Sequence, residues 1–269
     1  MRVIVTRPER EAQRWVRDLC GHGLEALALP LIQIGPVRDQ ANLIAAAQNS
    51  DGYVGIMFVS ANAVDYFFAC NPSLAIKLGA SGTGNSGTRA WATGPGTVRA
   101  LRRTGVALGR IDAPPSDAAQ FDSEALWQIV GSKVRSGERV LIVRGVDAFD
   151  GSEPSGGSGR EWFAQKLAST GAHVDYVVSY QRLVPQLGAV ERELAHQAAI
   201  DQSIWLFSSA QAVRNLQTAL PEQPWGQARA LATHARIAAM ARNAGFGVVW
   251  ESRPTLQDVL AALKSTDEL

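Results

Sequence analysis

Cysteine is scarce in this sequence of 269 residues, and neither sign of charge predominates. The two cysteines, Cys20 and Cys70, are too few and too far apart to predict a disulfide framework or a zinc site. Lys and Arg total 26 against 25 Asp and Glu, so the net charge of +1 argues against a broad surface for nucleic acid or an anionic membrane. We therefore expect no nucleic-acid partner.

Long apolar stretches are also missing. No run approaches the roughly 18 residues that a membrane span needs. The charged side chains spread over residues 1–15 exclude the apolar core of a secretory signal. From these absences we expect a soluble, cytoplasmic protein without a membrane partner.

The common catalytic motifs are absent as well. No two histidines stand three or four residues apart, which excludes a helical metal-binding pair. No G-x-S-x-G elbow, P-loop or C-x-x-C motif occurs. Residues 82–87 match the dinucleotide pattern G-x-G-x-x-G, but they precede a predicted strand instead of following one, so we reject that site. We expect no metal and no cofactor.

What the sequence does contain is a regular alternation of short β-branched runs and longer helical patterns. This alternation predicts an α/β fold with parallel sheets. The ten predicted strands cover residues 3–5, 24–34, 53–59, 89–93, 106–111, 139–143, 172–180, 203–207, 229–233 and 247–250.

An internal repeat divides these elements into two similar halves. Residues 2–7 (RVIVTR) resemble 139–144 (RVLIVR), and residues 58–64 (FVSANAV) resemble 207–213 (FSSAQAV). Residues 89–93 (RAWAT) likewise resemble 229–233 (RALAT). We therefore expect two similar five-stranded α/β units that arose by internal duplication.

Two Gly/Ser-rich segments interrupt the repeat, at 79–88 and 150–159. Their composition predicts mobile surface loops. The second follows a strand end, where α/β proteins bind ligands, so a flexible lid is the alternative interpretation.

Several candidate ligand-binding residues stand between a predicted strand and the next helix. The turn at 93–97 (TGPGT) would offer free backbone N–H groups to an anion, and Thr97 would add a hydroxyl. Ser60, Asn62 and Ser208 occupy similar junctions, where serine also serves as an ordinary helix N-cap. Helix capping and ligand contact both remain open at these positions.

Taken together, these segments resemble the uroporphyrinogen-III synthase family over nearly the whole chain. The resemblance rests on segments 5–8 (VTRP), 30–34 (PLIQI), 58–64, 93–97, 143–145 (VRG), 178–182 (VSYQR) and 206–209 (LFSS). It implies two flavodoxin-like α/β domains joined by a two-strand hinge near 34–38 and 180–185. One domain would combine 1–36 with 182–269, and the other would be inserted as 37–181. The repeat alone equally allows a simple division near residue 137.

The resemblance also implies an activity. Members of this family close the linear hydroxymethylbilane to uroporphyrinogen III, with loss of water and inversion of the terminal pyrrole ring through a spiro intermediate. This is a lyase reaction of haem biosynthesis that needs no metal or cofactor. The family further implies a monomer.

Site residues follow from the same resemblance. Tyr180 matches the family's cleft tyrosine, whose phenol would donate a proton to the leaving hydroxyl. Residues expected to bind substrate are Arg7, Ser60, Asn62, Thr97, Arg144, Ser208, Ser209 and Thr233. Where some members carry a second glycine turn with threonine, this chain has His234 to Ile237, so Thr233 or Arg236 would have to substitute.

Two alternatives to this enzyme remain open. A non-catalytic sensor would close two α/β lobes on an anionic metabolite and would tolerate loss of the Tyr180 hydroxyl. A two-lobed transferase would bind a nucleotide donor, for which only the turn at 93–97 is a candidate.

Overall fold

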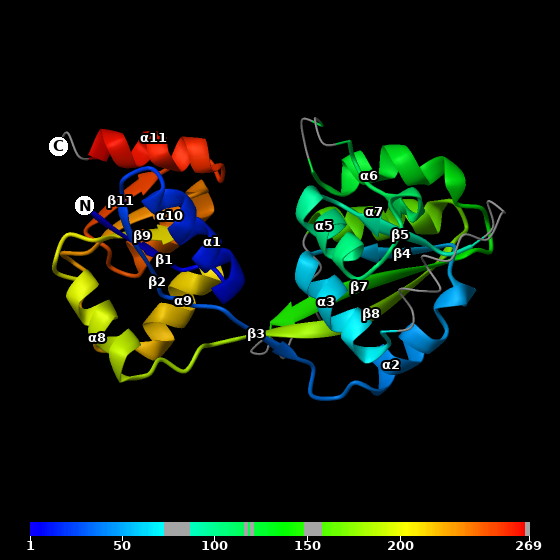
Figure 1. Ribbon diagram of the computed structural model, residues 1–269, viewed down its shortest axis with the longest axis horizontal. Coiled ribbons are helices and arrows are strands. Elements are labelled where there is room, and N and C mark those ends of the chain that lie inside the picture. The colour runs from blue at the N-terminus through cyan, green and yellow to red at the C-terminus, as the bar shows by residue number, and fades with distance from the viewer. Residues whose placement is uncertain (73–86, 116–117, 119–120, 148–157, 267–269) are drawn as a thin grey trace. The chain divides into compact units, whose positions relative to one another are not determined.

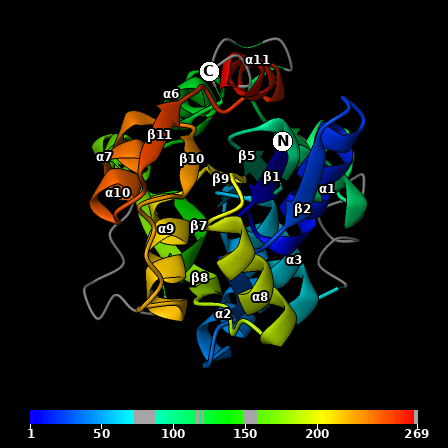
Figure 2. The ribbon, with the colours of Figure 1, turned by 90° about the vertical axis from the view of Figure 1, so that its left-hand side faces the viewer.

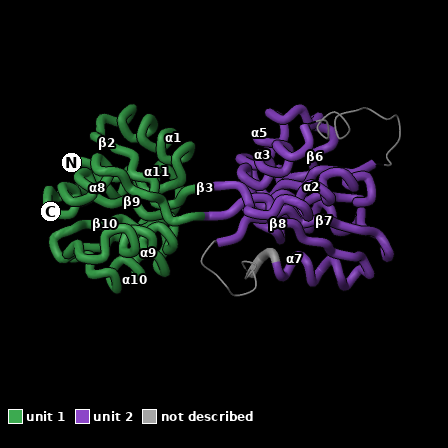
Figure 3. Tube along the Cα trace, turned by 90° about the horizontal axis from the view of Figure 1, so that it is seen from below, with its two compact units in different colours: residues 1–33, 183–269 green, residues 34–182 purple. Residues whose placement is uncertain are grey.

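A computed structural model describes residues 1–72, 87–115, 118, 121–147 and 158–266. The chain forms two compact units (Figures 1 and 3): Met1–Gln33 with Leu183–Leu269, here called unit 1, and Ile34–Arg182, called unit 2. Unit 1 thus draws on both ends of the chain. Of the two predicted Gly/Ser-rich loops, all but residues 87–88 and 158–159 lie outside the described residues.

Unit 1 is built around a five-stranded sheet in the order β11-β10-β9-β1-β2, which Figure 2 shows across the sheet. All of its strand pairs are parallel. The strands are β1 (Arg2–Val5), β2 (Glu25–Ala28), β9 (Ile204–Phe207), β10 (Arg229–Ala232) and β11 (Val248–Glu251). The helices are α1 (Glu9–Cys20), α8 (Ala189–Ala198), α9 (Ala210–Ala219), α10 (Ala235–Asn243) and α11 (Leu256–Thr266).

The two faces of this sheet have different cores. Val3, Val5 and Leu206 pack with α1 and α11 on one face. Successive strand residues point to opposite faces, so Trp205 and Phe207 face away from the side on which Leu206 packs. Both rings pack against Phe246. Every residue of β9 is buried, as expected for a central parallel strand.

Unit 2 contains a six-stranded sheet in the order β3-β8-β7-β4-β5-β6. The strands are β3 (Gln33–Pro36), β4 (Gly55–Phe58), β5 (Arg89–Ala92), β6 (Ile111–Asp112), β7 (Arg139–Asp147) and β8 (His173–Leu183). The helices are α2 (Ala41–Gln48), α3 (Ala61–Cys70), α5 (Pro95–Arg103), α6 (Ser123–Val130) and α7 (Ser158–Ser169). Strands β4, β5, β6, β7 and β8 pair in parallel.

Alternate residues of these strands face two helical layers. Ile56 and Phe58 of β4 belong to the cluster that includes α2, α3 and α5. Met57, between them, belongs to the cluster that includes α6 and α7. The period of two along the strand therefore produces a three-layer arrangement of helix, sheet and helix. The predicted α/β fold with parallel sheets is confirmed.

Both sheets share one strand order when their strands are matched by the sequence repeat. Unit 1 has β2-β1-β9-β10-β11, and unit 2 has β8-β7-β4-β5-β6, with β3 added beside β8. The repeat matches β1 with β7, β9 with β4 and β10 with β5, and each pair holds the same place in its sheet. The expectation of five strands in each unit was wrong for unit 2, because β3 adds a sixth.

The single strand expected over 24–34 was also wrong. Residues 25–28 form β2 in one sheet and 33–36 form β3 in the other. Between them stands Pro30, which has no N–H to donate to a ladder. The intervening Leu29 and Leu31 are nonetheless buried, which explains why the apolar pattern looked continuous.

The strand expected over 106–111 is reduced to the two residues of β6. A 3-10 turn occupies Leu108–Arg110, with a hydrogen bond of 2.9 Å from the Arg110 N–H to the Ala107 carbonyl. This turn lies within the range 106–111, so the backbone there is not extended as the sequence had predicted.

No helix among the described residues is long and apolar enough to cross a membrane.

An ion pair with a buried carboxylate joins β5 and β6, the neighbouring strands at one edge of the unit 2 sheet. The carboxylate of Asp112 is 5% exposed and accepts hydrogen bonds from Arg89 and, at 2.7 Å, from Lys133 Nζ. Burial by itself raises the pKa of this carboxyl, but the two cations outweigh it, so the pKa of Asp112 lies below its usual value. The charged form is therefore the one that stabilises the fold.

We expect Asp112→Asn to lower the free energy of unfolding at neutral pH by about 1–3 kcal/mol. The folded-state pKa is depressed, so the wild-type advantage is present above the unfolded pKa of about 4 and is lost as the pH falls through the folded value. Urea unfolding at pH 7 and at stepwise lower pH checks this. Asp175→Asn, which removes a more exposed pair with Arg139, should lower the free energy of unfolding less than Asp112→Asn does. An equal loss at every pH would contradict the prediction.

Candidate functional site

Five of the predicted site residues lie at the carboxyl ends of the parallel strands of unit 2, the edge where α/β sheets bind ligands. Ser60 and Asn62 follow β4, and Thr97 follows β5. Arg144 and Tyr180 lie within β7 and β8.

Tyr180 is held on several sides. The residue is 1% exposed and belongs to the apolar cluster beneath α2, α3 and α5. Its ring stacks on that of Tyr66, with 6.1 Å between ring centroids. Its hydroxyl lies 3.2 Å from Ser60 Oγ and accepts a hydrogen bond of 3.2 Å from Nη2 of Arg182. The hydroxyl of this buried ring thus has two hydrogen-bond partners, and buried tyrosines usually have at least one.

One extra residue in β8 decides which way Tyr180 points. Arg144 of β7 is opposite Val178, but the next residue, Gly145, is opposite Tyr180, so Ser179 is left without a partner in the register. This is a β-bulge, and it reverses the alternation of side chains beyond it. Val177 and Tyr180 therefore share the α3 face of the sheet although they are three residues apart.

A glycine opposite Tyr180 leaves room for the phenol ring. A Cβ placed on Gly145 would lie 2.3 Å from Cζ of Tyr180 and 2.5 Å from Cε2, far inside van der Waals contact. The phenol ring therefore occupies the space that a side chain would take, which explains the glycine in the segment 143–145.

Arg182 and Asp147 complete this cluster. Nη1 of Arg182 donates a hydrogen bond of 3.0 Å to Oδ1 of Asp147, which is directly opposite it in the β7–β8 ladder. Burial lowers the pKa of the Arg182 guanidinium, but Tyr180 and the Asp147 carboxylate outweigh this, so the pKa is raised and the charge is retained. We call Ser60, Tyr180, Arg182 and Asp147 the tyrosine cluster.

Ser60 is also the N-cap of α3. Its Oγ accepts a hydrogen bond of 3.1 Å from the Ala63 N–H. Asn62, in the first turn of the same helix, is half-buried. The helix-cap interpretation of Ser60 is confirmed, and the same Oγ atom contacts the Tyr180 hydroxyl.

Thr97 is less available than the glycine turn suggested. Its side chain is buried, and its N–H and that of Val98 both donate to the carbonyl of Gly94. Pro95 has no N–H, so the exposed Gly96 is the residue of this turn that offers one to an anion.

Arg144 is not brought together with Tyr180. Its guanidinium lies over the ring of Tyr176, 4.8 Å from the centroid. Strand alternation places Arg144 with Ile142, on the opposite face of the sheet from Val143 and Gly145.

In unit 1, Arg7 follows β1 and is held by α1. Its guanidinium stacks over Trp15, 4.5 Å from the ring centroid, and Nη1 donates to Glu11 at 3.3 Å. Burial lowers the pKa of Arg7, and Glu11 offsets part of this shift. Within the described part of the chain, the carboxylate paired with Arg7 is that of the exposed Glu11, so the guanidinium retains donors for another anion.

The remaining predicted residues lie at the carboxyl ends of β9 and β10. Ser208 is half-buried, and Ser209 caps α9 by accepting a hydrogen bond of 3.2 Å from the Gln211 N–H. Thr233 is buried, and its N–H donates to the Phe207 carbonyl.

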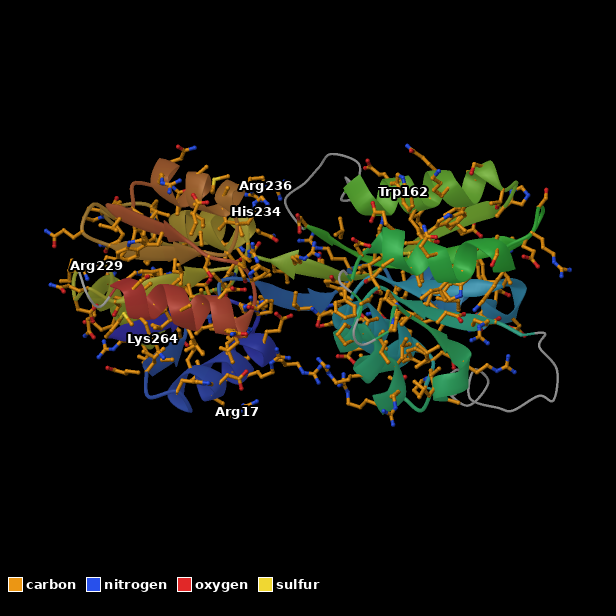
Figure 4. All side chains as sticks on the ribbon, turned by 90° about the horizontal axis from the view of Figure 1, so that it is seen from above. Arg17, Trp162, Arg229, His234, Arg236 and Lys264 are labelled. Atoms are coloured by element: carbon orange, nitrogen blue, oxygen red, sulfur yellow. The ribbon has the colours of Figure 1, made fainter. Side chains whose placement is uncertain are left out.

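The missing second glycine turn is replaced by a histidine cap. His234 is the N-cap of α10, and its Nδ1 accepts a hydrogen bond of 3.0 Å from the Arg236 N–H. Figure 4 shows both side chains at the start of this helix.

Sequence reasoning missed Arg182 and Asp147. Arg182 stood inside the segment 178–182, next to a predicted site residue, so a signal was present. Nothing in the sequence pointed to Asp147, whose position opposite Arg182 depends on the bulge. Among the residues that the structure describes, no group of three or more His, Cys, Asp or Glu side chains could hold a metal ion.

Comparison with known proteins gives one consistent family. The family model described as uroporphyrinogen-III synthase HemD matches residues 13–261. The uroporphyrinogen-III synthase of Escherichia coli (strain K12) is 26% identical over 258 residues, covering 91% of this chain and 92% of that protein. The protein of the same name from Chlorobaculum parvum is 30% identical over 147 residues, covering 53% of this chain. That match spans about half of the relative, 52% of its length.

Two solved structures show the same fold. The uroporphyrinogen-III synthetase of Helicobacter pylori 26695 has a TM-score of 0.58 at 15% identity, covering 99% of this chain and 100% of that one. A mutant uroporphyrinogen III synthase of the extremely thermophilic bacterium Thermus thermophilus has a TM-score of 0.51 at 17% identity, covering 100% and 99%. At these identities the likeness shows the α/β architecture.

We expect Gly145→Ala to displace the Tyr180 ring and to lower the free energy of unfolding by roughly 1–3 kcal/mol, because the added methyl overlaps a packed ring. Urea unfolding measures the loss, and near-ultraviolet circular dichroism reports the changed tyrosine environment. Gly109→Ala is the matched control, since a Cβ there meets nothing within 4 Å. Equal stability of both variants would show that the ring moves aside without cost.

Proposed function

This chain belongs to the uroporphyrinogen-III synthase family, whose model matches residues 13–261, and from that premise we propose that it converts hydroxymethylbilane to uroporphyrinogen III and water. The reaction is a cyclising lyase step in haem biosynthesis. The observation that carries the proposal beyond family membership is the tyrosine cluster, in which a phenol O–H is held beside a guanidinium at the carboxyl edge of a sheet.

The chemistry needs one proton donor and strict positioning. The hydroxyl of the hydroxymethyl group leaves as water after it takes a proton, and the remaining azafulvene is electrophilic. The substituted carbon of the terminal pyrrole attacks it to form a spiro intermediate. Fragmentation and closure at the other α-carbon invert that ring, and loss of a carbon-bound proton restores the pyrrole and returns the proton to the donor. Holding the flexible chain in one geometry selects this course.

We assign the proton donor to Tyr180. The phenol is an acid suited to protonate a leaving hydroxyl in place. We propose that the substrate's hydroxyl replaces Ser60 as the partner of the phenol proton. Ser60 keeps its hydrogen bond from Ala63, so α3 remains capped during the exchange.

The other predicted residues are proposed to bind substrate. Arg7 and Arg144 would hold the acetate and propionate carboxylates, since guanidinium groups match carboxylates geometrically. The N-cap and strand-end residues would contact the pyrrole chain through hydroxyl, amide and backbone groups; these are Ser60, Asn62, Thr97, Ser208, Ser209 and Thr233.

We also propose that units 1 and 2 are domains related by duplication, with the hinge near 34–38 and 180–185. The support is the shared order β2-β1-β9-β10-β11 and β8-β7-β4-β5-β6. Such a 2-1-3-4-5 order is that of flavodoxin-like folds.

We further propose that the protein is a monomer. Sedimentation in solution should then give a mass near 28.8 kDa. A mass of twice that value would contradict the proposal.

A coupled assay tests the function. Hydroxymethylbilane is generated in the presence of the folded protein, the products are oxidised, and the uroporphyrin isomers are resolved by chromatography. We expect mostly isomer III. Isomer I alone, the product of unassisted closure, would overturn the proposal and favour a non-catalytic sensor of an anionic metabolite.

In the same assay we expect Tyr180→Phe to lower kcat by about 100-fold or more, because the proton donor is removed while the ring stays. KM should change less than about threefold, since the hydroxyl contributes to the transition state more than to binding.

Tyr53→Phe is the matched control for this variant. Tyr53 is also a buried tyrosine of unit 2 whose hydroxyl accepts a hydrogen bond from an arginine, Arg139, but it precedes β4 instead of following the carboxyl ends. Its kcat should equal that of the wild type. An unchanged kcat in Tyr180→Phe would remove Tyr180 from the mechanism.

A further inference from the structure

We propose that Arg182, anchored by Asp147, is a positioning residue that sets the direction of the Tyr180 phenol proton and stabilises the charge left when that proton is transferred. This inference rests on the proposed function and deepens it.

The first argument is the geometry of β7 and β8 beyond the bulge. Gly145 is opposite Tyr180 and Asp147 is opposite Arg182, so the four residues form a two-by-two block. Residues two apart on a strand point to the same face. The bulge at Ser179 therefore brings the phenol and the guanidinium to one side together.

The second argument is that Arg182 bridges its two partners through different nitrogens. Nη1 donates to Asp147 at 3.0 Å, and Nη2 donates to the Tyr180 oxygen at 3.2 Å. The Cζ atom lies 5.5 Å from the Tyr180 ring centroid. A planar fork held at one end by a carboxylate has little freedom at the other, so its position is fixed relative to the phenol.

The third argument is the hydrogen-bonding capacity of the groups. A guanidinium has donors and no acceptor. The Tyr180 oxygen therefore accepts from Arg182, and its own O–H has to point elsewhere. Among the described residues, Ser60 Oγ, at 3.2 Å, is the other hydrogen-bond partner of the phenol, and it lies where we propose the substrate hydroxyl enters. Arg182 thus excludes the unproductive direction for the proton.

The fourth argument is electrostatic. When the phenol gives up its proton, negative charge develops on an oxygen of a residue that is 1% exposed. A guanidinium donor already in contact stabilises that charge without reorganisation. Before transfer, Asp147 balances the guanidinium, so the tyrosine cluster carries no net charge, and the side chains of the ion pair stay 29% and 34% exposed to solvent.

A second arginine pair in the same sheet provides an internal control. Arg139 pairs with Asp175, lies 4.8 Å from the Tyr53 ring centroid and donates to the Tyr53 hydroxyl at 3.4 Å. Arg139 thus has the same kinds of partner as Arg182, a carboxylate and a tyrosine, but it lies at the start of β7, whereas Arg182 lies at the end of β8. Any effect that both arginines share would be structural.

The test measures kcat and KM of Arg182→Gln, Arg182→Lys and Asp147→Asn in the isomer III assay, with Arg139→Gln as control. We expect Arg182→Gln to lower kcat by roughly 10- to 100-fold, the usual loss for a group that orients a reacting group. KM should change less than about threefold. Arg182→Lys should recover part of kcat, because it restores a cationic donor. The kcat of Asp147→Asn should lie between those of Arg182→Gln and Arg182→Lys. Arg139→Gln should match the wild type.

A double variant separates positioning from general structural support. If Arg182 acts through Tyr180, Tyr180→Phe combined with Arg182→Gln will be no slower than Tyr180→Phe alone. Multiplied losses would overturn the inference, as would a rise in KM without loss of kcat, which would make Arg182 a substrate-binding residue. Should Arg182→Gln fail to fold, the lysine variant and its double variant with Tyr180→Phe give the same comparison.

The outcomes also distinguish this inference from the proposed function. Wild-type protein that forms no isomer III would defeat the function itself. Wild-type protein that forms isomer III while Arg182→Gln remains as fast would defeat only the role of Arg182.

Discussion

The candidate site depends on one extra residue in one strand. Ser179 has no partner in the β7–β8 register, and its hydroxyl donates instead to the Arg144 carbonyl at 3.4 Å. Without this bulge, strand alternation would place Tyr180 with Tyr176, which is 46% exposed and lies on the other face with Arg144. With it, the phenol enters the core beside Gly145 and reaches Ser60. A local irregularity of the ladder therefore decides which tyrosine of β8 has a polar network around it.

The tyrosine cluster also shows how the position and the hydrogen bonds of a buried hydroxyl are fixed. An apolar ring in a close-packed core has few positions available, and here glycine on one strand and a stacked Tyr66 restrict it further. Two partners then determine the hydrogen bonds of the Tyr180 oxygen. One is a serine hydroxyl, which can donate and accept, and the other is a guanidinium, which only donates. The result is a phenol with a defined proton direction, which the proposed mechanism needs and which packing alone would not supply.

The two units differ at the corresponding turns although their sheets share one strand order. After β5, the chain has a glycine cap and a proline at the start of α5. After β10, His234 caps α10 through its side chain. The first turn leaves backbone exposed at Gly96, whereas the second presents an imidazole and Arg236. The two helix termini therefore offer different chemistry to a ligand, and the sequence repeat does not extend to the caps of α5 and α10.

The sequence by itself determined the alternation of strands and helices, the repeat, and the polar residues at strand ends, because these follow from hydrophobic periodicity and local capping chemistry. It also contained the motifs of the family resemblance, which implies a site role for Tyr180. It did not determine that residues 24–34 divide between two sheets, since Leu29 and Leu31 are buried and keep the apolar pattern continuous across the break. Nor did it reveal Asp147 as the partner of Arg182. Those features depend on which residues become neighbours across a ladder, and a shift of one residue at Ser179 changes every pairing beyond it. Only the tertiary structure decides that register, because it is set by contacts between strands that are distant along the chain.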